Sequence, residues 1–90
     1  MLEIILADAR FPQLRPHVTN FCKNYFDSFA KNKDSLTKQH GYRLRLEAAR
    51  LACIHLEKVA REQKDAKLAN FYAAKATEYL NERNGTYKTW

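Results

Sequence analysis

The sequence has few of the residues that interrupt regular structure, with two glycines and two prolines in 90 residues. A disordered chain is typically richer in such residues and poorer in aromatic ones. Here aromatic residues make up 12% of the chain and apolar residues 46%. The composition therefore predicts a folded protein, and its length suffices for one domain, over residues 1–90, but not for two.

Cysteine is also scarce. Cys22 and Cys53 lie far apart in apolar helical patterns, where a free thiol behaves as a small hydrophobic side chain. A secreted chain of this length would normally carry more cysteine. The run from Met1 to Leu6 contains an acid where a signal peptide carries positive charge, and no segment approaches the ~20 apolar residues of a membrane span. We therefore expect a cytoplasmic protein with no membrane partner.

Motifs for catalysis and metal binding are missing as well. The sequence has no glycine-rich phosphate loop, no nucleophile elbow and no His-Glu-x-x-His. His55 lies two residues from Cys53, and His17 five from Cys22, which are poor spacings for sharing a helix face. Zinc-finger spacings are absent too. We therefore predict no enzyme activity, no metal and no cofactor, and a small bundle has little room for a small-molecule substrate.

Apolar residues recur at three- and four-residue steps in three long segments, which is typical of amphipathic helices. The first segment runs from Pro12 to about Asn32, the second from Tyr42 to Gln63, and the third from Ala66 to about Asn84. Short loops between long helices favour antiparallel neighbours. The pattern thus predicts an all-α fold, a small antiparallel three-helix bundle with a long central helix.

Shorter segments join and flank these helices. Ser35 to His40 is expected to form a fourth, short helix that Gly41 breaks or kinks. Lys64-Asp65 is a tight connection in which Asp65 caps the third helix, and Gly85 ends that helix. Residues 1–11 are expected to form an N-terminal arm or short helix, and residues 86–90 a C-terminal tail.

The chain is strongly basic, with a formal net charge of +6 that attracts polyanions. Cations crowd between residues 31 and 50, where Asp34 and Glu47 are the acids. The alternative is an ordinary solvated face of a basic protein. The residues of this segment that we predict to bind a partner are Lys31, Lys33, Lys38, Tyr42, Arg43, Arg45 and Arg50.

The chain also has more aromatic residues than its core needs. It carries five Phe, five Tyr and one Trp, whereas a three-helix core of this size buries roughly six or seven. Protein interfaces concentrate Tyr, Trp and Arg at their energetic centres. Tyr42, Phe71 and Trp90, which fall outside the main stripes, are therefore predicted anchors. Alternatively, Phe71 packs on the N-terminal arm and Trp90 folds back onto the bundle.

These features predict a small, basic, non-catalytic binding protein. We expect a regulator or inhibitor that docks on an acidic site of a larger, nucleic-acid-handling protein complex, in the manner of small viral and mobile-element accessory proteins. The alternative is weakly sequence-specific DNA or RNA binding through Lys31 to Arg50, although a helix-turn-helix centred on Gly41 would need to bury polar residues. A third alternative is homo-oligomerisation through the wide apolar arc of the central helix.

Overall fold

The structure is a computed structural model that describes residues 10–88, with side chains described for residues 10–84. These residues form helices and loops and contain no strand, which confirms the predicted all-α bundle. A 3-10 turn leads into the first α-helix, and three further α-helices follow. The elements are η1 (Pro12–Leu14), α2 (Arg15–Lys31), α3 (Lys33–Leu36), α4 (Tyr42–Glu62) and α5 (Ala66–Lys88).

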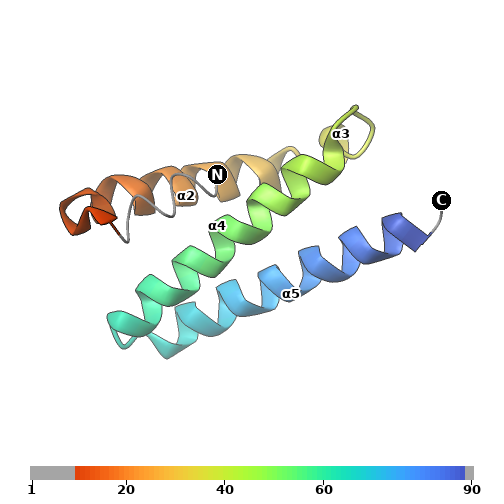
Figure 1. Cartoon of the computed structure of the whole chain (residues 1–90). Coiled ribbons are helices and arrows are strands. Elements are labelled where there is room, and N and C mark those ends of the chain that lie inside the picture. Colours follow the sequence, from red (N-terminus) through yellow and green to blue (C-terminus); the bar gives the residue numbers. More distant parts are fainter. Residues whose placement is uncertain (1–9, 89–90) are drawn as a thin grey trace.

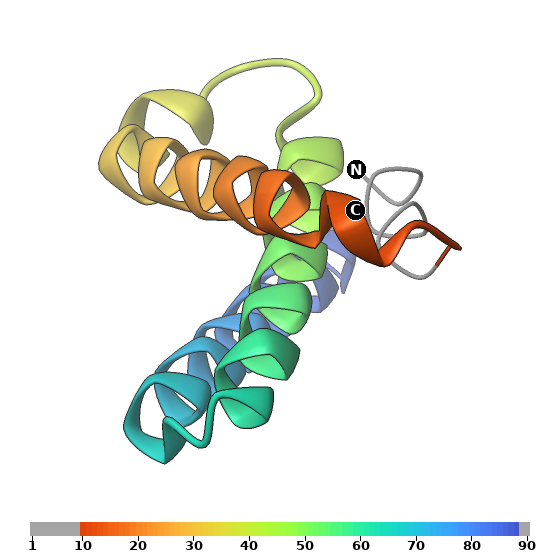
Figure 2. The same ribbon diagram turned by 90° about the vertical axis from the view of Figure 1, so that its left-hand side faces the viewer.

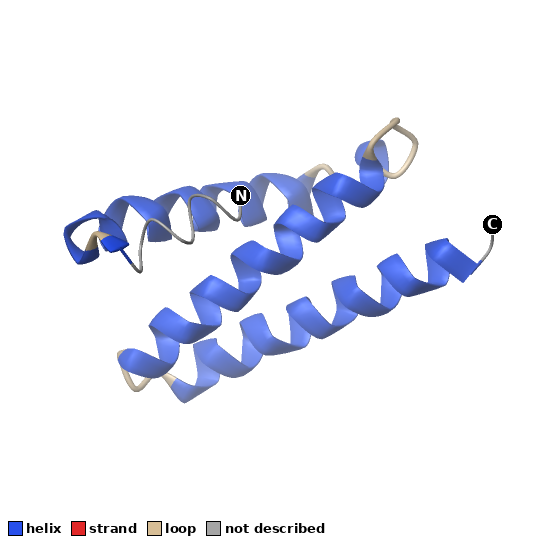
Figure 3. Ribbon diagram, in the orientation of Figure 1, coloured by secondary structure: helices blue, strands red, loops and turns tan. Residues whose placement is uncertain are grey.

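Helix α4 has the most extensive packing in the bundle, because it runs along α5 and also contacts α2. Figure 1 shows α4 and α5 side by side and antiparallel, with α2 on the other side of α4. α2 crosses this pair at a steep angle (Figure 2), and short loops connect the helices (Figure 3). α4 is therefore the central helix that the sequence predicted. None of the described helices combines the length and the apolarity needed to cross a bilayer.

The core is built around aromatic side chains of α2 and α5. The ring of Phe29 meets the ring of Tyr79 edge to face at 5.3 Å between centroids, and Phe26 meets Tyr72 in the same way at 5.6 Å. Such edge-to-face pairs are the favoured arrangement because the positive ring edge meets the negative ring face. α4 contributes small and aliphatic side chains to this core, which let the three helices approach closely: Leu46, Ala49, Ala52, Cys53 and Leu56.

Cys22 and Cys53 are not joined in a disulfide, and both are fully buried. Burial raises the pKa of the Cys53 thiol to about 12, because the charged thiolate is disfavoured away from water. A thiol in this environment is an inert core side chain, as the sequence pattern indicated.

The connection between α4 and α5 has the predicted geometry. Asp65 accepts a hydrogen bond from the backbone N–H of Leu68 at 3.1 Å, which confirms Asp65 as the cap of α5. Lys64 lies just before it in the left-handed region, at φ 61°. At the other end of α4, Gly41 is the N-cap residue and has φ 83°, a conformation that glycine adopts without strain.

Two predicted boundaries are wrong. The short helix is Lys33–Leu36 rather than Ser35 to His40, because helical hydrogen bonding resumes directly after α2, where Leu36 N–H donates to the Asn32 carbonyl at 3.0 Å. The last helix does not end at Gly85 but continues to Lys88, so residues 86–88 are not a tail. A glycine inside a helix costs about 1 kcal/mol, which a long packed helix tolerates.

Candidate functional site

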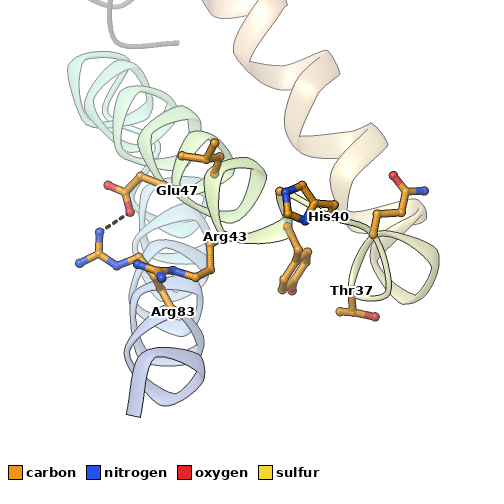
Figure 4. Close-up of a pocket in the computed structure, with 9 residues that line it drawn as sticks. Thr37, His40, Arg43, Glu47 and Arg83 are labelled. Atoms are coloured by element: carbon orange, nitrogen blue, oxygen red, sulfur yellow. Dashed lines mark hydrogen bonds and ion pairs between the residues drawn. The ribbon is translucent and has the colours of Figure 1, made fainter. Parts of the chain in front are cut away.

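A groove of about 620 Å³ opens at one end of the bundle. There the loop between α3 and α4 meets the first turns of α4 and the C-terminal part of α5 (Figure 4). We call it the basic groove. The residues that line it are Thr37, Gln39, His40 and Gly41 from the loop, Tyr42, Arg43, Leu44 and Glu47 from α4, and Arg83 from α5.

One carboxylate organises the α4–α5 side of this groove. Figure 4 shows Arg43, Glu47 and Arg83 gathered there, opposite Thr37 and His40 on the loop. An oxygen of Glu47 accepts a hydrogen bond from Arg83 Nη1 at 2.6 Å, and the same carboxylate is held by Arg50 one turn further along α4. Two guanidinium groups from two helices thus share one acid, which fixes α5 against α4 at the groove.

These contacts lower the pKa of the Glu47 carboxyl group. The hydrogen bond from Arg50 is the main cause, and the positive charges of Arg50 and Arg83 act in the same direction, against the opposing effect of burial. A carboxyl group with a lowered folded-state pKa contributes stability above its unfolded pKa, which is about 4.3 for Glu. That contribution is lost as the pH falls through the depressed folded-state pKa.

We therefore expect Glu47→Gln to reduce the free energy of unfolding by about 1–2 kcal/mol at neutral pH, because its three charge-assisted hydrogen bonds with Arg50 and Arg83 are weakened. The difference from the parent should shrink as both proteins are taken below pH 4, where Glu47 itself becomes protonated. Urea unfolding followed by circular dichroism at a series of pH values measures this. An equal loss of unfolding free energy at neutral and at strongly acidic pH would contradict a stabilising role for the ionised Glu47 carboxylate.

Tyr42 packs against the aromatic core, although it falls outside the main apolar stripes of the sequence. Its ring stacks on Phe29 at 6.1 Å between centroids and 13° between planes, and its hydroxyl donates to the carboxylate of Glu82. Burial and this neighbouring acid raise the pKa of the Tyr42 hydroxyl well above its usual range. The other oxygen of Glu82 pairs with Lys33 Nζ at 2.6 Å. Tyr42 and Lys33 therefore tie α4 and α3 to the C-terminal half of α5.

The remaining predicted cations lie at the same end of the bundle. Lys31 and Lys38 are exposed, Arg43 is half-buried in the groove wall, and Arg45 donates a hydrogen bond to Gln39 in the loop. The first turn of α4 contains no acidic residue and has no side-chain cap, so the positive end of its dipole adds to these charges. The fold thus gathers the basic segment into one positively charged end.

Of the predicted aromatic anchors, Tyr42 lines the basic groove with these cations, whereas Phe71 does not. Phe71 lies twelve residues before Arg83 on α5, a separation of about 18 Å at the rise of an α-helix. Its ring packs edge to face on Tyr72 at 5.3 Å and on Phe26 at 6.1 Å. Trp90 lies outside the described residues, as do residues 1–9 of the predicted arm.

Of the nine residues that line the basic groove, sequence reasoning selected Tyr42 and Arg43 and missed the other seven, among them Leu44, Glu47 and Arg83. Leu44 belongs to a second apolar set on the central helix, so the sequence did carry a signal for it. Glu47 and Arg83 are 36 residues apart, and no local spacing predicts their pairing. By contrast, Glu57 and Arg61 are four residues apart on α4 and form the expected ion pair at 2.8 Å.

The described side chains show no arrangement suited to metal chemistry. Within them, no three His, Cys, Asp or Glu residues gather closely enough to hold a metal ion. The buried His55 instead lies 3.2 Å from the hydroxyl of Thr19, joining α4 to α2. Comparison with known proteins finds no match, because no family model, no curated protein and no solved structure is detectably similar to this chain.

Proposed function

We propose that this protein is a small non-catalytic regulator or inhibitor that binds an acidic site of a larger protein through the basic groove. The observation that carries this proposal is the position of Leu44, whose side chain is 79% exposed at the lining of a groove that also holds Arg43 and Arg83. Arginine is enriched at the centres of protein interfaces, and a large apolar side chain left in solvent gains free energy when a partner covers it.

A protein partner suits this groove better than nucleic acid does. Arg83 of the groove wall is already held by the Glu47 carboxylate, which leaves less positive charge for the closely spaced phosphates of a nucleic-acid backbone. Two of the predicted cations, Lys33 and Arg50, are already held by acids of the protein itself. An apolar side chain such as Leu44 gains nothing from a phosphate backbone but gains free energy when a protein surface covers it.

The size and charge of the chain also indicate what kind of complex its partner belongs to. A chain of this size and charge, without catalytic motifs, resembles in composition the accessory proteins of viruses and mobile elements. Many of their targets are machines that handle nucleic acid, whose acidic patches attract a cationic partner. We therefore expect the bound protein to belong to such a complex.

The test is a comparison of two double variants of the full chain. Arg43→Glu with Leu44→Asp is expected to weaken partner binding at least roughly tenfold, about 1.4 kcal/mol. Ile54→Asp with Lys58→Glu makes the same chemical changes at exposed positions of α4 away from the groove, and should leave binding unchanged. Each tagged protein is incubated with untreated and with nuclease-treated lysate, the captured partner is identified by mass spectrometry, and its affinity is then measured with purified components.

Two outcomes would overturn the proposal. One is equal binding by the groove variant and its matched control, provided that circular dichroism shows both to be folded. The other is bound material that disappears with nuclease treatment, which would favour direct nucleic-acid binding through exposed cations such as Lys31 and Lys38. In that case affinity should fall steeply with salt concentration, because binding releases counterions from the phosphates.

A further inference from the structure

The α4–α5 hairpin ends at the loop Gln63 to Asp65, and Figure 2 shows this end turned away from most of α2, whose first residue Arg15 pairs with Glu62. At this end, the first turns of α5 carry an apolar pocket of about 430 Å³ lined by Asp65, Lys67, Leu68 and Phe71. We call it the hairpin pocket. Leu68 is 39% exposed and Phe71 is 46% exposed, so two large apolar side chains of one helix face solvent together.

The aromatic wall of this pocket is held in place from below. The ring of Phe71 rests edge to face on Tyr72 and Phe26, both of which are buried. Lys75 lies on the next turn of α5, with its Nζ 6.0 Å from the centroid of the Phe71 ring, within the range of a cation–π contact. A ring fixed in this way loses little freedom when a ligand covers it, which lowers the entropic cost of binding.

The acidic residues near the pocket have interaction partners within the protein. The Asp65 carboxylate accepts the N–H of Leu68 as a helix cap, and Glu62 pairs with Arg15 of α2. In contrast, Lys64 and Lys67 form no ion pair with any side chain in residues 10–84. The rim of the apolar pocket therefore carries Lys64 and Lys67 against the single carboxylate of Asp65, a net positive charge, and the partner that complements it has an apolar residue flanked by carboxylates.

We infer that the hairpin pocket is a second docking site, which takes an aromatic or aliphatic anchor residue from an acidic peptide segment of a partner protein. The site does not depend on the basic groove, because Phe71 and Arg83 are about 18 Å apart along α5. A partner that engages both sites would bind more tightly than either site allows alone, through the raised effective concentration of the second contact.

The experiment uses nuclear magnetic resonance of the full, isotopically labelled chain with three short synthetic peptides. The first peptide is rich in Glu and has a central Phe, the second has Ala in place of that Phe, and the third has Lys in place of each Glu. The first is expected to shift the backbone amide signals of residues 64–72 and to bind at least roughly tenfold more tightly than the other two.

Two variants locate the effect on the pocket without removing a core side chain. Leu68→Asp is expected to weaken binding of the first peptide at least roughly tenfold, whereas Leu44→Asp, the same change in the basic groove, should not affect it. Lys64→Glu combined with Lys67→Glu should abolish the preference for the acidic peptide over the basic one. Both lysines are exposed, so these variants are expected to keep the fold.

Three results would overturn the inference. The first is equal binding of the Phe and Ala peptides, and the second is a set of shifted signals confined to the basic groove at residues 37–47. That second result would leave the proposed function standing while removing the hairpin pocket from it. The third is movement of the residue 64–72 signals with protein concentration alone, together with a dimer mass in sedimentation, which would assign the pocket to a second copy of the chain.

Discussion

Replacing Phe29 by alanine is expected to lower the free energy of unfolding by about 3–5 kcal/mol, the range for large aromatic truncations in a core. Phe29 is 3% exposed, and its ring contacts Tyr42 of α4 as well as Tyr79 of α5. Its removal therefore leaves a cavity where three helices meet. A domain of 90 residues has roughly 4–13 kcal/mol of stability in total. The variant should consequently lose a large fraction of the stability of the protein.

Urea unfolding followed by circular dichroism measures this effect, with Leu44→Ala as the control. Leu44 is an equally apolar residue on α4 that faces solvent, so its truncation should change stability by less than about 0.5 kcal/mol. A loss below about 1 kcal/mol for Phe29→Ala would mean that the aromatic cluster does not hold α2 to the other helices.

Gly41→Val is expected to cost about 1–3 kcal/mol, because a β-branched residue at a positive φ is strained. Gly41 lies at φ 83° immediately before α4. A Cβ at this position would meet no atom within 4 Å, so the cost comes from the backbone conformation and not from crowding. Gly41→Asn should cost clearly less, since asparagine tolerates the left-handed region.

Thermal unfolding of the two Gly41 variants separates these explanations. A lower melting temperature for the Val variant than for the Asn variant is the expected order. Equal losses would show that the loop can start α4 with an ordinary φ. Because Gly41 lines the basic groove, the same pair of variants also reveals whether the loop conformation contributes to partner binding.

The helices and most of their boundaries could be predicted from local sequence. Periodic apolar residues define which face each helix buries. Asp65 marks the start of α5, because its carboxylate accepts a hydrogen bond from the backbone N–H of the residue three positions later. Gly85 misled the prediction because a C-cap glycine and a tolerated helix-interior glycine have the same sequence signature. The two cases differ in the tertiary packing of the helix, and local sequence does not indicate that packing.

The sequence predicted which segment of the chain carries the candidate site, but not which side chains form its surface. The crowding of cations between residues 31 and 50 located the basic end of the bundle, and the chain folds that segment around one groove. Arg50 is held by Glu47 three residues before it on the same helix, whereas Lys33 is held by Glu82 of α5, which only the tertiary fold brings near. Tyr42 joins the core for a similar reason, because its ring reaches Phe29 across the α2–α4 interface.

The brief connection between α4 and α5, only Gln63 to Asp65, also bears on how the chain folds. Closing so short a loop costs little chain entropy, and the most extensive interface of the molecule joins exactly these two sequence neighbours. Such low contact order is typical of chains that fold in microseconds to milliseconds. We therefore expect the hairpin to form early and the docking of α2 onto Tyr72 and Tyr79 to be the late step that completes the aromatic core.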